Sequence, residues 1–145
     1  MIIRTASAED LDVVHRLLRD AELPVEGVDE QFGPGYAVAT EAGGVIGAAG
    51  VERHGRFGLL RSVVVAREAR NRGAAELLVR DRLAWAGTEG LEAVYLLTTT
   101  AARYFTRLGF EPVERDALPL EIRESREFAA LCPSTAVAMR RPAGA

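Results

Sequence analysis

Residues 62–75 read SVVVAREARNRGAA and join an apolar strand directly to the start of a helix. The valines at 63–65 favour an extended strand, and apolar residues recur with helical spacing from Gly73 to about Thr88. Glycine and alanine at 73–75 leave the backbone open to a ligand. The first N–H groups of a helix lack intrahelical partners and attract anions, aided by the helix dipole. The stretch therefore predicts a strand, an anion-binding turn and a helix.

Two interpretations of this turn remain open when it is taken alone. Arg67, Arg70 and Arg72 give it local positive charge that suits a diphosphate, but the same residues fit an ordinary turn with solvated arginines. A Walker loop is excluded because no Gly-Lys-Ser/Thr follows. A dinucleotide fingerprint is excluded because its first glycine spacing is missing. The position of the turn in the chain has to decide.

The chain before the turn predicts a strand, a helix and three antiparallel strands. Ser7 and Asp10 have the spacing of a capping box that opens a helix, and Pro24 stops that helix. The segment from Leu23 to Pro34 is a loop with room for one helical turn. The expected elements are a strand at 2–6, a helix over about 11–21, a hairpin of strands at 36–40 and 45–52, and a long strand at 57–66.

After the central helix the pattern becomes strand, helix, strand. Gly109 caps a short helix, and a more polar, less regular segment follows at 115–132. The expected elements are a strand at 93–98, a helix at 101–108, a strand at 110–114, a helix at 125–131 and a closing strand at 135–139. The predicted fold class is α+β, with one mixed sheet flanked by helices.

Composition fits one globular domain, which we place at residues 1–141 with a loose tail at 142–145. The 18 basic and 21 acidic residues give a net charge of -3, so no nucleic-acid partner is expected. Neither a leader nor a run of about 18 apolar residues is present, so we expect no membrane association. The single cysteine, Cys132, excludes an intramolecular disulfide and a multi-cysteine zinc cage, and it favours a cytoplasmic location. No metal is expected.

The turn resembles the acyl-CoA signature of the GCN5-related N-acetyltransferase (GNAT) family, Gln/Arg-x-x-Gly-x-Gly/Ala, matched here by Arg70, Gly73 and Ala75. The opening residues 3–11 and the run YFTRLGF at 104–110 are similar to the first strand and helix and the fourth helix of that family. This resemblance implies the GNAT fold: a mixed, mostly antiparallel sheet of six to seven strands, about four flanking helices, and strands four and five splayed apart. It also implies acetyl-CoA as the acetyl donor.

By this resemblance, amides of Val63 and Val65 pair with the pantetheine arm as if it were a neighbouring strand. Asn71 and Ala75 replace glycines common in the family, but they keep every backbone donor. The predicted cofactor-binding residues are Val63, Val65, Arg70, Asn71, Arg72, Gly73, Ala74, Ala75 and Thr100.

A closer resemblance is to short acetyltransferases linked to arsenic resistance, in the runs LLRSV at 59–63, LLTTTA at 96–101, and Glu127-Phe128 with 131–133. It implies acetylation of the primary amine of a small amino-acid-like substrate, a glutamate analogue or an arsenic-containing amino acid, by direct attack on the thioester. Two alternatives are a non-catalytic acyl-CoA sensor and a protein N-terminal acetyltransferase. A homodimer is left open.

The catalytic groups are less clearly defined by the sequence. Phe105 stands where the family often has a tyrosine that protonates the departing thiolate; the neighbouring Tyr104 is the candidate donor, with core packing as the alternative. Thr98 and Thr100 end a strand, where their hydroxyls could bond the acetyl group or only fill the strand and cap a helix.

On the acceptor side Glu52 is the first candidate for the general base, with a solvated surface role as the alternative. His54 and Ser62 are further candidates for contact with the acceptor. Arg61 is the candidate for binding an acceptor carboxylate, since an arginine on a strand that otherwise reads as buried needs either an acidic partner or a ligand.

Overall fold

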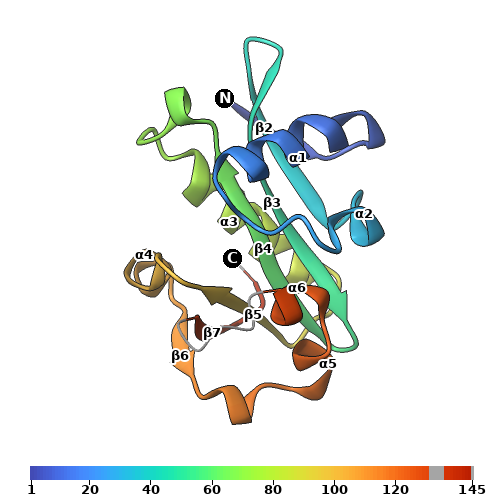
Figure 1. Ribbon diagram of the computed structural model, residues 1–145, viewed down its shortest axis with the longest axis vertical. Coiled ribbons are helices and arrows are strands. Elements are labelled where there is room, and N and C mark those ends of the chain that lie inside the picture. The colour runs from blue at the N-terminus through green and yellow to red at the C-terminus, as the bar shows by residue number, and fades with distance from the viewer. Residues whose placement is uncertain (131–135, 145) are drawn as a thin grey trace.

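A computed structural model of the protein describes residues 1–130 and 136–144 (Figure 1). Seven strands form one sheet in the order β1-β2-β3-β4-β5-β7-β6, and only the β4–β5 pair is parallel. The predicted α+β class with a mixed, mostly antiparallel sheet is confirmed. The elements are β1 (Ile2–Thr5), α1 (Leu11–Asp20), α2 (Val28–Gln31), β2 (Tyr36–Glu41), β3 (Gly44–His54), β4 (Phe57–Val65), α3 (Ala74–Thr88), β5 (Ala93–Thr98), α4 (Ala102–Arg107), β6 (Glu111–Val113), α5 (Leu120–Arg123), α6 (Arg126–Ala130) and β7 (Val137–Pro142).

The sheet splits between β4 and β5. Their pairing covers only residues 57–59 and 93–95, although β4 continues to Val65 and β5 to Thr98. A β-bulge interrupts the β3–β4 ladder just beyond the paired part, where Ser62 adopts a positive φ of 60°. Because a bulge bends its strand and increases the local twist, it turns β4 away from β5. The predicted splay of strands four and five is confirmed.

Helices cover both faces of the sheet (Figure 1). On one face α3 and α4 pack against the strands through Val79, Leu83 and Phe105. On the other face α1 and α2 cover β2, β3 and β4 through Val14 and Leu18, and α5 covers β4 and β5 further along. The β4 side chains alternate between these faces. Consequently the side of β4 that faces α2 and α6 is enclosed and can hold buried polar groups.

The structure has six α-helices among its described residues, against about four expected. The two additional ones are single turns. The turn at α2 was anticipated within the loop at 23–34, whereas α5 was missed, because four residues that bury only Ile122 give no measurable helical period.

The carboxyl-terminal residues are held more firmly than predicted. Pro142 ends β7, the Ala143 amide donates to the Glu92 carbonyl (3.3 Å) and the Gly144 amide donates to the Leu83 carbonyl (3.0 Å). Residues 142–144 are therefore anchored instead of loose, because they extend the last strand across the end of α3. Ala145, Cys132 and the rest of the expected helix end and strand start at 131–135 lie outside the described residues.

The predicted capping box at the start of the first helical segment is present. The Ser7 amide donates to Asp10 Oδ2 (2.8 Å), and Arg4 donates to both Asp10 oxygens (2.8 and 3.0 Å). The Arg4 guanidinium and the Ser7 donors hold the pKa of Asp10 at about 2, below its usual value, against the opposing effect of burial. The ionised carboxylate thus ties β1 to the first helical turn.

We expect Asp10→Asn to lower the free energy of unfolding by about 1 kcal/mol at pH 7, a value reduced for the solvent screening of the half-exposed Arg4. Because the folded pKa of Asp10 lies below the unfolded one, this stabilisation is present above about pH 4 and fades as the pH falls towards 2. Urea unfolding of both proteins between pH 7 and pH 2 measures it. A stability difference independent of pH would contradict the assignment.

Candidate active site

A cavity of about 400 Å³ lies beside β4 where that strand has left β5. The end of β4, the turn that follows it, the start of α3 and Tyr104 of α4 form its walls. It collects all the predicted cofactor-binding residues except Arg72 and Thr100. Its lining residues are Ala21, Leu23, Val63, Val64, Val65, Ala69, Arg70, Asn71, Gly73, Ala74, Ala75, Glu76 and Tyr104.

The turn into α3 has the geometry of an anion site. Asn71 and Gly73 both adopt positive φ, 67° and 85°, which turns the chain sharply from the strand into the helix. Gly73 is the N-cap and has no side chain to accept from the helix, while its carbonyl accepts from the Leu77 amide (3.1 Å). By helix geometry the amides at 74–76 have no intrahelical acceptor. They are donors available to a diphosphate at the cavity wall.

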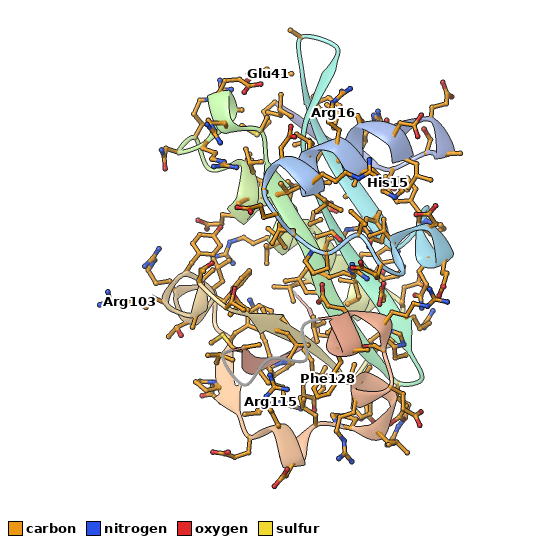
Figure 2. The ribbon with its side chains drawn as sticks, viewed as in Figure 1. His15, Arg16, Glu41, Arg103, Arg115 and Phe128 are labelled. Carbon is orange, nitrogen blue, oxygen red and sulfur yellow. The ribbon has the colours of Figure 1, made fainter. Side chains whose placement is uncertain are left out.

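The two arginines of the turn have different surroundings. Arg70 donates from Nε to the Val65 carbonyl (2.9 Å), which ties the turn to the end of β4. Arg72 forms an ion pair with Glu41 (2.8 Å), which Figure 2 labels on the β2–β3 hairpin. Backbone amides and Arg70 therefore supply the positive potential of the cavity, while the charge of Arg72 is paired outside it.

Tyr104 lines the cavity, whereas Phe105 lies in the hydrophobic core. Phe105 is buried against Phe110, and its ring meets the Tyr104 ring edge-on at 5.3 Å. Tyr104 is half-buried and lines the cavity; burial, and secondarily the Glu76 carboxylate, raise the pKa of its phenol. The phenol is consequently protonated at neutral pH. Its ring packs on the core while its residue also belongs to the cavity wall.

The threonines at the end of β5 lie in different environments. Thr98 is buried, and its hydroxyl accepts from the amide of Ala101, the N-cap residue of α4 (3.0 Å), while α4 itself has no side-chain cap. Thr100 is exposed and is not part of the cavity lining. Contact of either hydroxyl with a bound cofactor stays a prediction.

On the enclosed side of β4, Arg61 is fully buried within a set of acceptors. It donates to the Glu26 carbonyl (2.5 Å) and the Pro24 carbonyl (3.0 Å) of the loop before α2. It also donates to Glu52 Oε2 (2.9 Å), and its Nε lies 3.4 Å from Glu127 Oε1 on α6. Arg61 thereby fastens the loop, β3 and α6 to β4. Its pairing with two carboxylates meets the requirement that the sequence predicted, and binding of an acceptor carboxylate stays a prediction.

Glu52 and His54 lie next to each other on β3. The second oxygen of Glu52 is 3.0 Å from His54 Nε2, so each carboxylate oxygen of Glu52 has a partner. A cavity of about 250 Å³ opens beside them, lined by Gly27, Glu30, Gln31, Glu52, His54, Glu124, Ser125 and Arg126. Ser62 accepts from Arg61 Nε (3.2 Å) and lies 3.3 Å from the Tyr36 hydroxyl.

Two members of this cluster were missed as site residues, Tyr36 and Glu127. Tyr36 belongs to an expected strand and carried no signal, whereas Glu127 stood in one of the runs that resemble the arsenic-resistance acetyltransferases and was given no role there. Burial, opposed by Arg61 and assisted by Glu52, raises the pKa of Glu127 to about 8. Next to Glu127, Phe128 packs beneath the Arg115 guanidinium at 5.3 Å, which holds α6 in place (Figure 2).

Residues 1–130 and 136–144 contain no group of three or more histidine, cysteine or acidic side chains placed to bind a metal ion. Across the same ranges, no helix has the length and apolar character needed to cross a membrane.

A sheet that splits between two parallel strands, with a cavity at the start of the helix that joins them, is the arrangement that the resemblance to the GNAT family implied. The chain belongs to the GNAT acetyltransferase family, since residues 33–112 match the model described as Acetyltransferase (GNAT) domain. The predicted membership of an acyltransferase family is confirmed. The arsenic-resistance branch stays a prediction.

Two curated relatives carry acetyltransferase names. An uncharacterized N-acetyltransferase of Chlorobaculum tepidum is 31% identical over 73% of this chain and 65% of its own length. The amino-acid acetyltransferase of Edwardsiella ictaluri is 39% identical over 44% of this chain and 14% of its own. The chain thus spans about two thirds of one relative and a small part of the other.

Among solved structures, N-acetylglutamate synthase from Neisseria gonorrhoeae, complexed with coenzyme A and N-acetyl-glutamate, matches 98% of this chain and 35% of its own. The TM-score is 0.82 at 20% identity. A Mycobacterium tuberculosis protein in complex with CoA and NLQ matches 98% of this chain and 99% of its own, with a TM-score of 0.79 at 19% identity. At these identities the likeness establishes the fold.

Proposed function

We propose that the protein is an acetyl-CoA-dependent N-acetyltransferase that acetylates the primary amine of a small, amino-acid-like substrate by direct attack on the thioester. The use of acetyl-CoA as acetyl donor is supported by the cavity at the split of β4 and β5. There residues 73–76 present backbone amides beside the open edge of β4. Amides of the helix start would hold the diphosphate, and the β4 residues Val63 and Val65 would pair with the pantetheine arm.

The proposal that the acceptor is an amine rests on the acidic residues at the enclosed side of β4. The smaller cavity is lined by the carboxylates of Glu30, Glu52 and Glu124 against one arginine, Arg126, which itself pairs with Glu30 (2.9 Å). An excess of carboxylates favours a cationic ligand, and an ammonium is the form of an amine acceptor at neutral pH. The names of an amino-acid acetyltransferase and an N-acetylglutamate synthase among the similar proteins support an amino acid, with glutamate analogues and arsenic-containing amino acids as the first candidates.

The deciding experiment is acetyl transfer from acetyl-CoA to a panel of primary amines, comprising L-glutamate, its phosphorus and arsenic analogues, other amino acids and short peptides. Release of CoA thiol and the mass of the product are measured together. Saturable release with an acetylated amino acid is the expected result. Release no faster than acetyl-CoA hydrolysis with every amine would refute the proposal, and acetylation confined to peptides would favour a protein N-terminal acetyltransferase.

Tyr104 is the residue that we propose as proton donor to the departing thiolate. We expect Tyr104→Phe to lower kcat by about 10- to 100-fold, because it removes a protonated hydroxyl and keeps the ring that packs against Phe105. The dissociation constant for acetyl-CoA should stay within about 2-fold. Tyr95→Phe, a buried tyrosine on β5 outside the cavity lining, is the matched control. An unchanged kcat in Tyr104→Phe would assign this side chain to packing.

Phe105 favours one other candidate, a non-catalytic acyl-CoA sensor, since the position often filled by a tyrosine in the family carries no hydroxyl. A sensor would bind acetyl-CoA without turnover, so any acetylated product rules it out. We also propose a cytoplasmic location. The sequence left a homodimer open, and sedimentation of the purified protein tests it.

A further inference from the structure

One buried polar atom of the charged cluster lacks a partner. Among the described residues, Glu127 Oε2 is the one buried side-chain nitrogen or oxygen atom without a hydrogen bond. Glu127 is 4% exposed, and its other oxygen lies 3.4 Å from Arg61 Nε. An unsatisfied carboxylate oxygen in a buried site costs free energy, which a ligand with a donor group would recover.

The two carboxylates of the cluster therefore differ in what they can still bind. Glu52 has one oxygen on Arg61 at 2.9 Å and the other on His54 at 3.0 Å. A group so engaged is poorly placed to accept a proton from a substrate. Glu127 shares the same arginine but keeps Oε2 open. Glu127 does not itself line the smaller cavity, but it follows the lining residues Ser125 and Arg126 in the chain, and its Oε2 is the oxygen of these two carboxylates that has no donor.

We infer that Glu127 binds and deprotonates the acceptor amine. Its Oε2 receives a hydrogen bond from the substrate ammonium and removes one of the ammonium protons. The inference rests on the proposed function and names a residue for its acceptor step. Glu52 then acts as a positioning residue, which holds Arg61 between the two carboxylates and leaves Glu127 half-satisfied until an ammonium binds.

The proton balance of the step is simple. The ammonium passes one proton to Glu127, and the lone pair of the neutral amine attacks the thioester carbonyl carbon as the N–C bond forms. The C–S bond then breaks, and the second proton leaving the nitrogen ends on the thiolate, giving amide and CoA thiol. The proton on Glu127 passes to solvent when the product leaves, so each turnover releases one proton.

The electrostatic setting agrees with a base that works near neutral pH. Burial raises the pKa of Glu127 to about 8, with Arg61 of β4 opposing and Glu52 of β3 assisting. Tyr36 of β2 also faces the cluster and is neutral, since burial raises the pKa of its phenol. His54 of β3 pairs with the Glu52 oxygen that does not bind Arg61 (3.0 Å). A base is most effective when its pKa lies near the working pH.

Glu127→Gln tests the inference, because it keeps the shape of the side chain and removes the base. With the best amino acid of the panel we expect kcat/KM to fall by about 10²- to 10⁴-fold, and the rise of kcat/KM with pH near 8 to disappear. Hydroxylamine is already uncharged at neutral pH and needs no base, so acetyl transfer to it should fall by less than about 5-fold. Glu121→Gln, on the exposed side of α5, is the matched control and should leave both reactions unchanged.

The outcomes separate the two claims. If the wild type acetylates no amine, the proposed function and this inference fail together. If the wild type is active and Glu127→Gln keeps kcat/KM within about 3-fold, only the inference fails. Equal losses with the amino acid and with hydroxylamine would also overturn it, since they indicate a structural role. Selective loss with the ammonium acceptor supports it.

Discussion

Gly73→Glu is expected to weaken acetyl-CoA binding by at least about 100-fold while the fold survives. At φ 85° a residue other than glycine is strained by about 1–2 kcal/mol, which a domain of this size tolerates. A Cβ at Gly73 would meet no atom within 4 Å, so the new side chain has room. Its carboxylate would lie at the amides of the first turn, where it would occupy the anion site and repel the diphosphate. Calorimetric titration with acetyl-CoA measures the loss.

Gly90→Glu is a close control for this change. Gly90 follows the other end of α3, has φ 77°, and likewise would have no atom within 4 Å of an added Cβ. The substitution adds the same charge and a similar strain far from the cavity, so affinity should stay within about 2-fold. The loss of stability should be at least that of Gly73→Glu, because a carboxylate at the end of α3 opposes the helix dipole. Wild-type affinity in Gly73→Glu would refute the placement of the diphosphate.

Arg61→Met is expected to cause the largest loss of stability, about 3–5 kcal/mol at pH 7. It removes the donor shared by the Pro24 and Glu26 carbonyls and leaves Glu52 and Glu127 buried together without their cation. Because burial already raises the pKa of Glu127, this carboxyl takes up a proton as the pH falls, so the loss should shrink as the pH is lowered. Urea unfolding at pH 5 and pH 8 measures this trend.

Two further variants decide whether the buried charges cause that loss. Adding Glu52→Gln and Glu127→Gln to Arg61→Met removes the unpaired carboxylates and should recover most of the lost stability, as replacement of buried ion networks often does. Arg56→Met breaks an exposed pair with Glu92 (3.4 Å) and should change stability by less than about 0.5 kcal/mol. A triple variant as unstable as Arg61→Met would show that loop anchoring, and not charge burial, dominates.

The fold could be predicted from the sequence because its elements have strong local patterns. The valines of β4, the small residues at 73–75 and the helical period of α3 lie within one continuous stretch, and resemblance over nearly the whole chain placed that stretch in a GNAT sheet. The predictions were wrong where the sequence pattern was short or depended on distant partners. The single turn α5 was not predicted because it is too short to show a helical period. The anchoring of residues 142–144 was not predicted because their partners, Glu92 and Leu83, are distant in sequence.

The residues of the candidate site also differ in whether local sequence could predict their positions. The cavity by α3 collected the predicted Gly73 and Tyr104 because strand, turn and helix are consecutive or follow a familiar order. Arg72 was expected there as well, yet it pairs with Glu41 across the hairpin. This ion pair depends on where the β2–β3 hairpin lies relative to the turn, so the residues around Arg72 in the sequence do not predict it.

By itself the sequence determined the order of helices and strands and the anion-binding turn, because backbone donors and small residues act locally and need no distant partner. Only the tertiary structure decided how the buried charges are shared. Arg61 meets the loop before α2, Glu52 and Glu127, residues that are 35, 9 and 66 positions away along the chain. Which carboxylate is satisfied and which keeps a free oxygen depends on how closely β3, β4 and α6 pack together, because a hydrogen bond is lost when its two atoms move apart by about 1 Å.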